Sequence, residues 1–143
     1  MTKVGVVRGT FQIIHPGHVK LLTQAKSLVD ILYVFIDSDT NVKRIKGECL
    51  VPAGDRAAVL MGLKPVDDVR IFQDEDHFKS LVDLRKGLWE FESAKHKYYF
   101  KGGDYKPNDL PEYSFLTWCG WTVCCLGHSG HSTSDIVKRI KNG

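Results

Sequence analysis

The stretch from Gly9 to His18 constrains the fold more than any other part of the chain. It follows a short apolar run at residues 4–7, typical of a buried strand, and leads into residues 19–25, where apolar side chains recur at helical spacing. The sequence therefore predicts that a strand turns into a helix here. His15 and His18, separated by proline and glycine, stand where that helix begins. Backbone N–H groups and both imidazoles can then point at one anion, which we expect to be a phosphate.

Apolar runs and helical periodicities alternate along the rest of the chain. The expected strands and helices, in chain order, are strand 3–8, helix 17–28, strand 31–36, helix 54–63, strand 66–72, helix 78–89, an aromatic strand from 98, a short amphipathic segment 111–118, strand 121–126 and a closing helix after 132. This alternation predicts an α/β fold with a doubly wound five-stranded parallel sheet in the Rossmann-like order 3-2-1-4-5. Its switch point would place the histidine loop beside the loop that follows the fourth strand.

Length and composition narrow the class of protein. A chain of 143 residues is the size of one domain, so we expect a single domain over 1–143. Its 43% hydrophobic and 26% charged residues are ordinary for a globular protein, and a net charge of +3 is too small to indicate nucleic acid. Without a bilayer-length apolar run or a signal pattern, we expect a cytoplasmic protein and no membrane partner. The four cysteines lack metal-ligand spacing, which favours reduced structural thiols and no protein-bound metal.

The Gly-Thr-Phe sequence followed by His-x-Gly-His resembles the signature of the nucleotidyltransferase superfamily of cytidylyltransferases and small adenylyltransferases. The resemblance implies that His15 and His18 stabilise the transition state at the α-phosphorus of a nucleoside triphosphate. It also implies a set of nucleotide-binding residues around them, namely Gly9, Thr10, Phe11 and Gly17.

Three cations fall within four residues at Lys43, Arg44 and Lys46. A charge run of this kind is by itself typical of a solvated face. Here it follows the second strand and lies close to the expected phosphate site. The Lys-Arg-hydrophobic-Lys-Gly segment resembles the adenylyltransferase domain of ADP-heptose synthase, which assigns Lys46 to a phosphate. A lysine suits a flexible point-charge contact of this type.

The segment 101–107 reads Lys-Gly-Gly-Asp-Tyr-Lys-Pro. A glycine pair lets the backbone approach a ligand closely, although a plain loop explains two glycines more often than not. As a whole, the segment resembles the matching loop of the ADP-heptose synthase adenylyltransferase domain, and this implies that Lys101, Gly102 and Asp104 bind the nucleotide. Glycerol-3-phosphate cytidylyltransferases have Gly-Asp-Asp at the same place, so Asp104 is common to both.

A second helix start lies near the end of the chain. Ser132 and Asp135 have the spacing of a capping box, which by itself is a structural feature. The sequence Gly-x-Ser-Thr-Ser before the last helix also resembles the superfamily's second phosphate-binding motif. On that resemblance, Ser132 and Thr133 hold the outer phosphates, and two helix N-termini face one triphosphate.

Three further residues have open roles, as acceptor contacts or as supports of the site. Gln12 stands where the family commonly has aspartate; it keeps a hydrogen-bond acceptor but loses the charge. Asp39 follows the second strand, where it either contacts a ligand or, like Thr40, caps the next helix. Arg56 matches a family arginine that follows an acidic or polar residue, and either reaches the substrates or forms a surface ion pair.

The sequence contains neither a Walker loop nor a G-x-G-x-x-G fingerprint, so kinase and dehydrogenase classes lose their main support. The resemblance implies in-line attack by a substrate phosphate on the α-phosphorus of ATP or CTP, with release of pyrophosphate. The expected acceptor is a phosphorylated sugar, most like heptose 1-phosphate. Magnesium is expected mainly on the nucleotide phosphates.

Two alternatives remain open. One is a cytidylyltransferase for glycerol 3-phosphate or a related polyol phosphate. Those enzymes carry an arginine shortly before their Ser-Thr, where this chain has Gly127-His128. This difference favours an enzyme that resembles the adenylyltransferase domain of ADP-heptose synthase. The other is a nucleotide-binding module with weakened catalysis, for which Gln12 is the argument. Family members are commonly dimers, so we expect a homodimer by analogy.

Overall fold

The computed structural model describes residues 2–72, 91, 93–103 and 106–127. The predicted helix at 78–89 and the closing helix lie outside the described residues, as do three predicted site residues, Asp104, Ser132 and Thr133.

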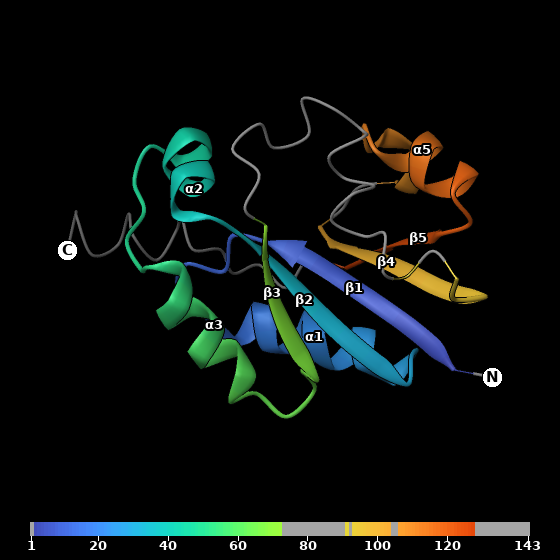
Figure 1. The fold of residues 1–143 in the computed structure, drawn as a ribbon, viewed down its shortest axis with the longest axis horizontal. Helices are drawn as coiled ribbons and strands as arrows, with labels where there is room; N and C mark the ends of the chain where they lie inside the picture. The colour runs from blue at the N-terminus through green and yellow to red at the C-terminus, as the bar shows by residue number, and fades with distance from the viewer. Residues whose placement is uncertain (1, 73–90, 92, 104–105, 128–143) are drawn as a thin grey trace.

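A five-stranded parallel sheet forms the centre of the molecule (Figure 1). Its strands are β1 (Lys3–Gly9), β2 (Ile31–Asp37), β3 (Asp68–Phe72), β4 (His96–Gly102) and β5 (Thr122–Leu126). Their order, β3-β2-β1-β4-β5, confirms the predicted topology. Three strands extend beyond the predicted bounds: β1 and β2 each continue by one residue, to Gly9 and Asp37, and β4 begins two residues earlier, at His96.

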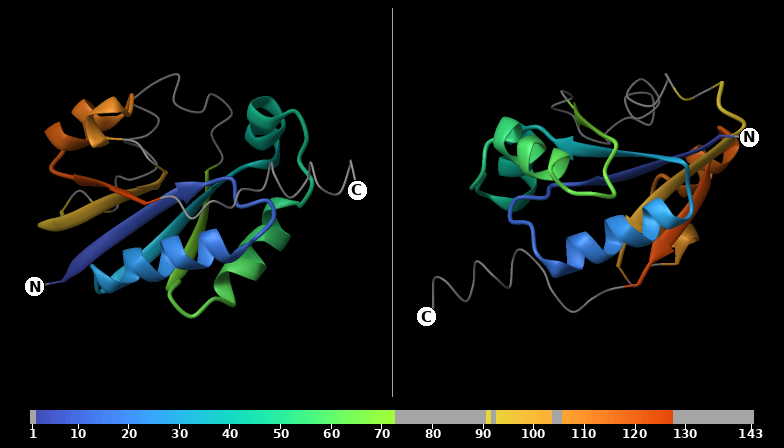
Figure 2. Two further views of the ribbon diagram at one scale, coloured as in Figure 1. Left: turned by 180° about the vertical axis from the view of Figure 1, so that it is seen from behind. Right: turned by 90° about the horizontal axis from the view of Figure 1, so that it is seen from below.

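Helices cover both faces of the sheet. The helices α1 (Pro16–Ser27) and α3 (Ala53–Met61) lie on one face, in front of the strands in the left view of Figure 2. The 3-10 helix η2 (Pro107–Asp109) and α5 (Tyr113–Trp118) lie at the other face. The helix α2 (Asp39–Lys46) follows the carboxyl end of β2 directly (Figure 1). No helix in the described ranges is long and apolar enough to cross a bilayer.

Two apolar cores on opposite faces of the sheet explain why the strands read as continuous apolar runs. In β2, the side chains of Leu32, Val34 and Ile36 enter the core beneath α1 and α3, whereas Phe35 enters the core beneath α5. Leu22 anchors α1 to this sheet with a fully buried side chain, a contribution of about 1.5–3 kcal/mol.

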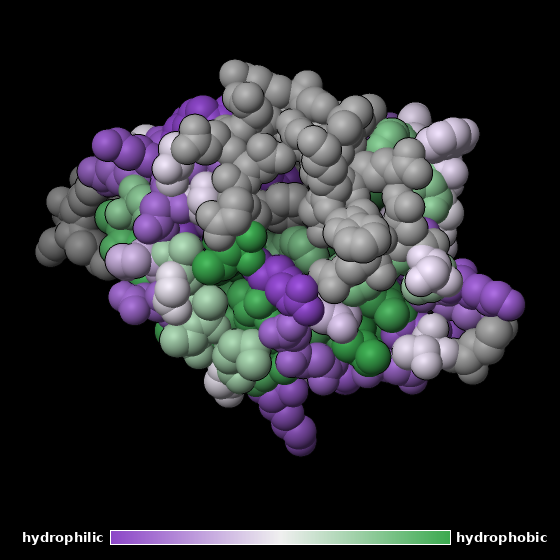
Figure 3. Space-filling view, in the orientation of Figure 1, coloured by the Kyte–Doolittle hydropathy of each residue, from purple (hydrophilic) through white to green (hydrophobic). Residues whose placement is uncertain are grey.

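The surface outside the two cores is mixed. Figure 3 shows apolar residues exposed among polar ones on the part of this face that is coloured by hydropathy. Several large apolar side chains are exposed, among them Leu50, Val59, Met61 and Trp118. Scattered exposure of this kind is normal for a folded domain. All four cysteines are free thiols, and the neighbours Cys124 and Cys125 pack into opposite cores, as alternation along a strand predicts.

The strand register brings the functional loops to one edge of the sheet. Gly9, the last residue of β1, is level with Ile36 near the end of β2. β4 lies on the other side of β1 and runs in the same direction. The chain therefore leaves β1, β2 and β4 at the same edge, with the topological switch point between β1 and β4, which is where open α/β sheets bind their ligands.

Candidate active site

The two histidines cap the N-terminus of α1 reciprocally. His15 is the N-cap residue, in extended conformation, and its Nδ1 accepts a hydrogen bond from the N–H of Gly17 at 3.1 Å. Three residues on, Nδ1 of His18 accepts from the N–H of His15 at 3.3 Å. The result is a capping box built from imidazoles, in which Pro16 occupies the first helical position. The two rings stack with their centroids 3.8 Å apart.

This capping arrangement determines the tautomer of both imidazoles. A backbone N–H can only donate, so Nδ1 is the acceptor in each ring, and each neutral ring carries its proton on Nε2. Burial, followed by the nearby His15, lowers the pKa of His18 to about 4, while a contact with the Ile13 carbonyl acts in the opposite direction. His18 is therefore a neutral hydrogen-bond donor at neutral pH.

The first amides of α1 are already used within the turn. The N–H of Gly17 donates to the His15 ring, and the N–H groups of His18 and Val19 both donate to the His15 carbonyl. Our sequence-based expectation that backbone N–H groups here would point at an anion does not fit these contacts. For an anion, this helix start offers its dipole and the two imidazole rings, of which His18 is in contact with the Ile13 carbonyl.

The turn before the histidines contains a strained residue. Phe11 has a φ of 47°, a value that bulky residues rarely adopt. Its ring is buried and lies 5.0 Å, centroid to centroid, from the ring of His18. The same ring covers Gly9, where an added Cβ would lie only 2.9 Å from it. Gly9, Thr10 and Phe11 thus form the support beneath the histidines.

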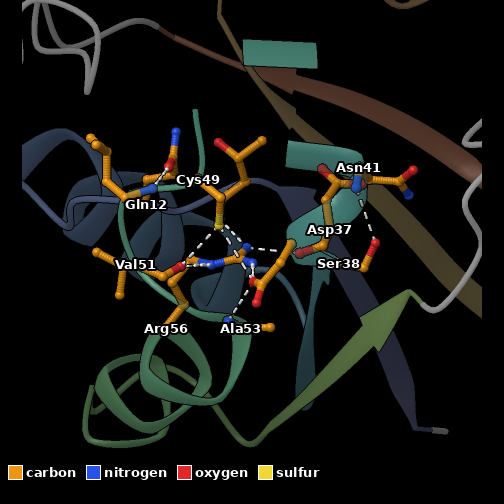
Figure 4. Close-up of polar contacts among 11 residues, drawn as sticks. Gln12, Asp37, Ser38, Asn41, Cys49, Val51, Ala53 and Arg56 are labelled. Carbon is orange, nitrogen blue, oxygen red and sulfur yellow. Dashed lines mark hydrogen bonds and ion pairs between the residues drawn. The ribbon is translucent and has the colours of Figure 1, made fainter. Parts of the chain in front are cut away.

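Arg56 is the centre of a buried hydrogen-bond network (Figure 4). Its Nη1 donates to the carbonyls of Thr10 and Asp37, each at 2.8 Å. Its Nε donates to the Val51 carbonyl, and its Nη2 forms an ion pair with Asp39, both also at 2.8 Å. Because the Arg56 side chain is fully buried, a surface ion pair does not describe it.

Asp39 belongs to the same network. Its Oδ1 accepts from Arg56, from the N–H of Ala53 at 2.7 Å and from the thiol of Cys49 at 3.4 Å. Burial works to raise the pKa of Asp39, but these hydrogen bonds outweigh it and leave the pKa below its ordinary value. The predicted capping role is wrong, because Ser38 caps α2 by accepting from the N–H of Asn41. Asp39 instead joins the start of α2 to the start of α3.

Gln12 attaches the histidine turn, residues 10–15 between β1 and α1, to the loop between α2 and α3. Its side chain is buried, and Oε1 accepts from the N–H of Leu50 at 2.7 Å (Figure 4). An aspartate at this position would be shorter by one methylene. The glutamine therefore has a structural contact of its own, which depends on its length.

Lys46 ends α2 and is exposed, together with Lys43 and Arg44. Gly47 follows it as the left-handed helix cap, with a φ of 85°. Among the residues that the structure describes, no hydrogen bond or ion pair joins Lys46 to the histidine turn. Its connection to the site runs through the loop that Gln12 holds.

The end of β4 lies against α1. Gly102 packs so closely against this helix that an added Cβ would lie 3.0 Å from the Leu21 side chain. Lys101, half-buried, precedes it on the opposite face of the strand. The predicted placement of the β4 end beside the histidine helix is therefore supported for Gly102.

A buried ion pair at this edge was missed by our sequence analysis. Arg8 Nη2 and Asp37 Oδ1 are 2.8 Å apart, and both side chains are 4% exposed. They stand near the carboxyl ends of the two central strands. The signal in the sequence is a charged residue at the end of each of two apolar strands that pair with each other.

Comparison with known proteins gives the family. The sequence model of the family described as "Cytidylyltransferase-like" matches residues 6–113. Among curated proteins, the bifunctional protein HldE of Bradyrhizobium sp. (strain ORS 278) is 37% identical over 144 residues, and that of Streptomyces coelicolor is 36% identical over 138 residues. These matches cover 98% and 94% of this chain but 27% and 28% of the relatives. The chain thus spans about a quarter of the length of the curated relatives it matches.

Solved structures share the fold at low sequence identity. A lipopolysaccharide core biosynthesis protein from Thermoplasma volcanium GSS1 has a TM-score of 0.70 and 23% identity, covering 92% of this chain and all of that one. Thermotoga maritima TmcAL, bound with alpha-thio ATP, has a TM-score of 0.70 and 13% identity, covering 99% of this chain and 50% of that one. Because the family model matches most of its length, this chain belongs to the cytidylyltransferase-like family and is a nucleotidyltransferase.

Proposed function

We propose that this nucleotidyltransferase transfers a nucleoside monophosphate from ATP or CTP to a phosphorylated sugar, most like heptose 1-phosphate. The reciprocal imidazole capping of α1 is the observation that carries the proposal. It holds the two rings stacked with their centroids 3.8 Å apart, and Nδ1 of each ring accepts a backbone N–H, so Nε2 is the nitrogen that can donate. Such donors stabilise negative charge that develops on a phosphate without needing a covalent intermediate.

The reaction is an in-line displacement. An oxygen of the acceptor phosphate attacks the α-phosphorus, the bond from that phosphorus to the bridging oxygen breaks, and pyrophosphate leaves with the bond's electron pair. His15 and His18 donate hydrogen bonds to the oxygens of the α-phosphoryl group as charge grows there. Lys46 balances charge on the transferring or the acceptor phosphate.

The remaining nucleotide contacts follow from the family resemblance. Lys101, Gly102 and Asp104 bind the nucleotide at the end of β4, and Ser132 and Thr133 hold the outer phosphates. Magnesium, when bound, neutralises charge on the triphosphate. Within the described part of the chain, no group of three or more His, Cys, Asp or Glu side chains is arranged to hold a metal. We expect the metal to be held mainly by phosphate oxygens and water.

The test is pyrophosphate release with ATP or CTP against heptose 1-phosphate, glycerol 3-phosphate and other sugar and polyol phosphates. We expect release that requires an acceptor, strongest with a sugar 1-phosphate. His18→Ala should lower kcat by about 100- to 1,000-fold, or roughly 3 kcal/mol, because one donor to the transition state is lost. His96→Ala, which removes a half-buried histidine at the start of β4, is the matched control.

Two other outcomes would redirect the proposal. Release with CTP and glycerol 3-phosphate alone would identify a polyol-phosphate cytidylyltransferase. Nucleotide binding without release for every acceptor would indicate a module with weakened catalysis, for which Gln12 in place of the family aspartate is the argument.

A further inference from the structure

We propose that Gln12 and Arg56 are positioning residues that hold Phe11 in its left-handed conformation and thereby orient the His18 ring. Neither side chain then needs to touch a substrate. The catalytic consequence rests on the proposed transfer reaction, whereas the structural consequence can be measured without it.

The strain at Phe11 requires a cause in its surroundings. A left-handed conformation is unfavourable for a bulky residue, so it persists only where neighbouring contacts enforce it. The Phe11 ring is 3% exposed, fills the space over Gly9 and lies against His18. The strained backbone thus directs a large ring onto one of the two proposed catalytic side chains.

Contacts on both sides of Phe11 supply that enforcement. The carbonyl of Thr10, directly before it, accepts from Arg56 Nη1 at 2.8 Å. Directly after it, Gln12 Oε1 accepts from the N–H of Leu50 at 2.7 Å. The residue is therefore held from its N-terminal side by a side chain of α3 and from its C-terminal side by the α2–α3 loop.

Arg56 is a rigid point of attachment. Besides Thr10, it binds the carbonyls of Asp37 and Val51 and the carboxylate of Asp39. These partners come from the end of β2, the start of α2 and the loop before α3, so the guanidinium is fixed independently of the histidine turn. Four of its five N–H donors are engaged in this way, so the guanidinium supports the turn without needing to contact the substrate.

The decisive variants change the length of residue 12. Gln12→Asn keeps the amide but shortens the side chain by one methylene, so its oxygen loses the Leu50 N–H. Gln12→Glu keeps the length and the acceptor oxygen. We expect the asparagine variant to lower kcat by roughly 10- to 100-fold, with a smaller change in KM for the nucleotide. The glutamate variant should retain most of kcat.

A second measurement reports the structure directly. NMR of the ligand-free protein records the ring-current shift that Phe11 imposes on the carbon-bound protons of His18. This shift should diminish in Gln12→Asn and persist in Gln12→Glu. Gln24→Asn makes the same chemical change on the exposed side of α1 and should leave both the shift and kcat unaltered. Arg56→Lys should also diminish the shift, with Arg70→Lys, at a half-exposed ion pair, as its control.

The outcomes separate the two proposals. If Gln12→Asn keeps both the ring-current shift and kcat, the positioning role is wrong. If the shift behaves as expected but the unsubstituted protein releases no pyrophosphate with any acceptor, the positioning role holds and the proposed transfer reaction fails. Should Arg56→Lys fail to fold, as judged by thermal unfolding, the two Gln12 variants still decide the matter.

Discussion

The structural roles of several single residues in this protein do not follow from residue type alone. The sequence indicates that His15 and His18 act together, because a helix start with two imidazoles at this spacing is a specific pattern. It does not indicate that they cap each other, since that depends on ring rotation within the turn. Arg56 shows the same limit. The sequence suggests either a substrate contact or a surface ion pair, but the hydrogen-bond partners of its side chain lie 5 to 46 positions away in sequence.

The lowered pKa of His18 predicts how stability depends on pH. The unfolded chain takes up a proton on this ring near pH 6.5, whereas the folded protein resists protonation until about pH 4. Between these values the unfolded state binds more protons, so this residue makes the folded state lose stability as pH falls from 6.5 toward 4. Denaturant unfolding across this range should show a smaller loss in His18→Gln. An equal loss in both proteins would assign the pH dependence to other groups.

The buried ion pair between Arg8 and Asp37 predicts a strong effect of single substitutions. Asp37→Asn removes the buried carboxylate charge that pairs with Arg8 at 2.8 Å, which should destabilise the fold by about 3–5 kcal/mol. The control is Asp68→Asn, because Asp68 pairs with Arg70 at side chains that are 41% and 42% exposed. That change should alter the free energy of unfolding by about 1 kcal/mol or less. Similar losses for the two variants in urea unfolding would contradict this account.

At the scale of helices and strands, prediction succeeds where local pattern decides and fails where distant contacts do. The strands follow from apolar runs covered on both faces, and α1 follows from helical spacing after the histidines. The sequence leaves Asp39 either as a ligand contact or, with Thr40, as a candidate N-cap of α2, whereas the cap in the structure is Ser38. Asp39 has the residue type of a cap, but Ala53 and Arg56, 14 and 17 positions further on, occupy its carboxylate, and Ser38 caps the helix instead.

The packing of the turn after β1 predicts opposite effects of the same substitution at two glycines. Gly9→Ala places a methyl group 2.9 Å from the Phe11 ring and should destabilise the protein by about 1–3 kcal/mol, because the buried ring has to move. Gly54→Ala, in the first turn of α3, meets nothing within 4 Å and should be neutral or stabilising by about 0.5 kcal/mol. Thermal unfolding of both variants checks the contrast. A neutral Gly9→Ala would mean that the ring is not held against this strand.

For the whole molecule, strand order is what makes one site out of separate segments. The predicted order 3-2-1-4-5 places the ends of β1 and β4 side by side, and the close packing of Gly102 on α1 agrees with it. The identity of the base and of the acceptor does not follow from strand order. Those depend on side-chain positions within loops, where shifts of an ångström change specificity.

A last prediction concerns the effect of bound nucleotide on the stability of the whole fold. A ligand that binds only the folded protein stabilises it by about 2.7 kcal/mol at 100 times its dissociation constant, so ATP or CTP with magnesium should raise Tm. The nucleotide that gives the larger increase in Tm at equal concentration identifies the preferred base. Removing magnesium with EDTA should reduce the increase, because the triphosphate charge is then not neutralised. His15→Ala should reduce it as well, whereas His96→Ala should not, since His96 starts β4 at the opposite edge of the sheet from the histidine turn. If neither nucleotide changes Tm, the helix start of α1 does not bind a triphosphate.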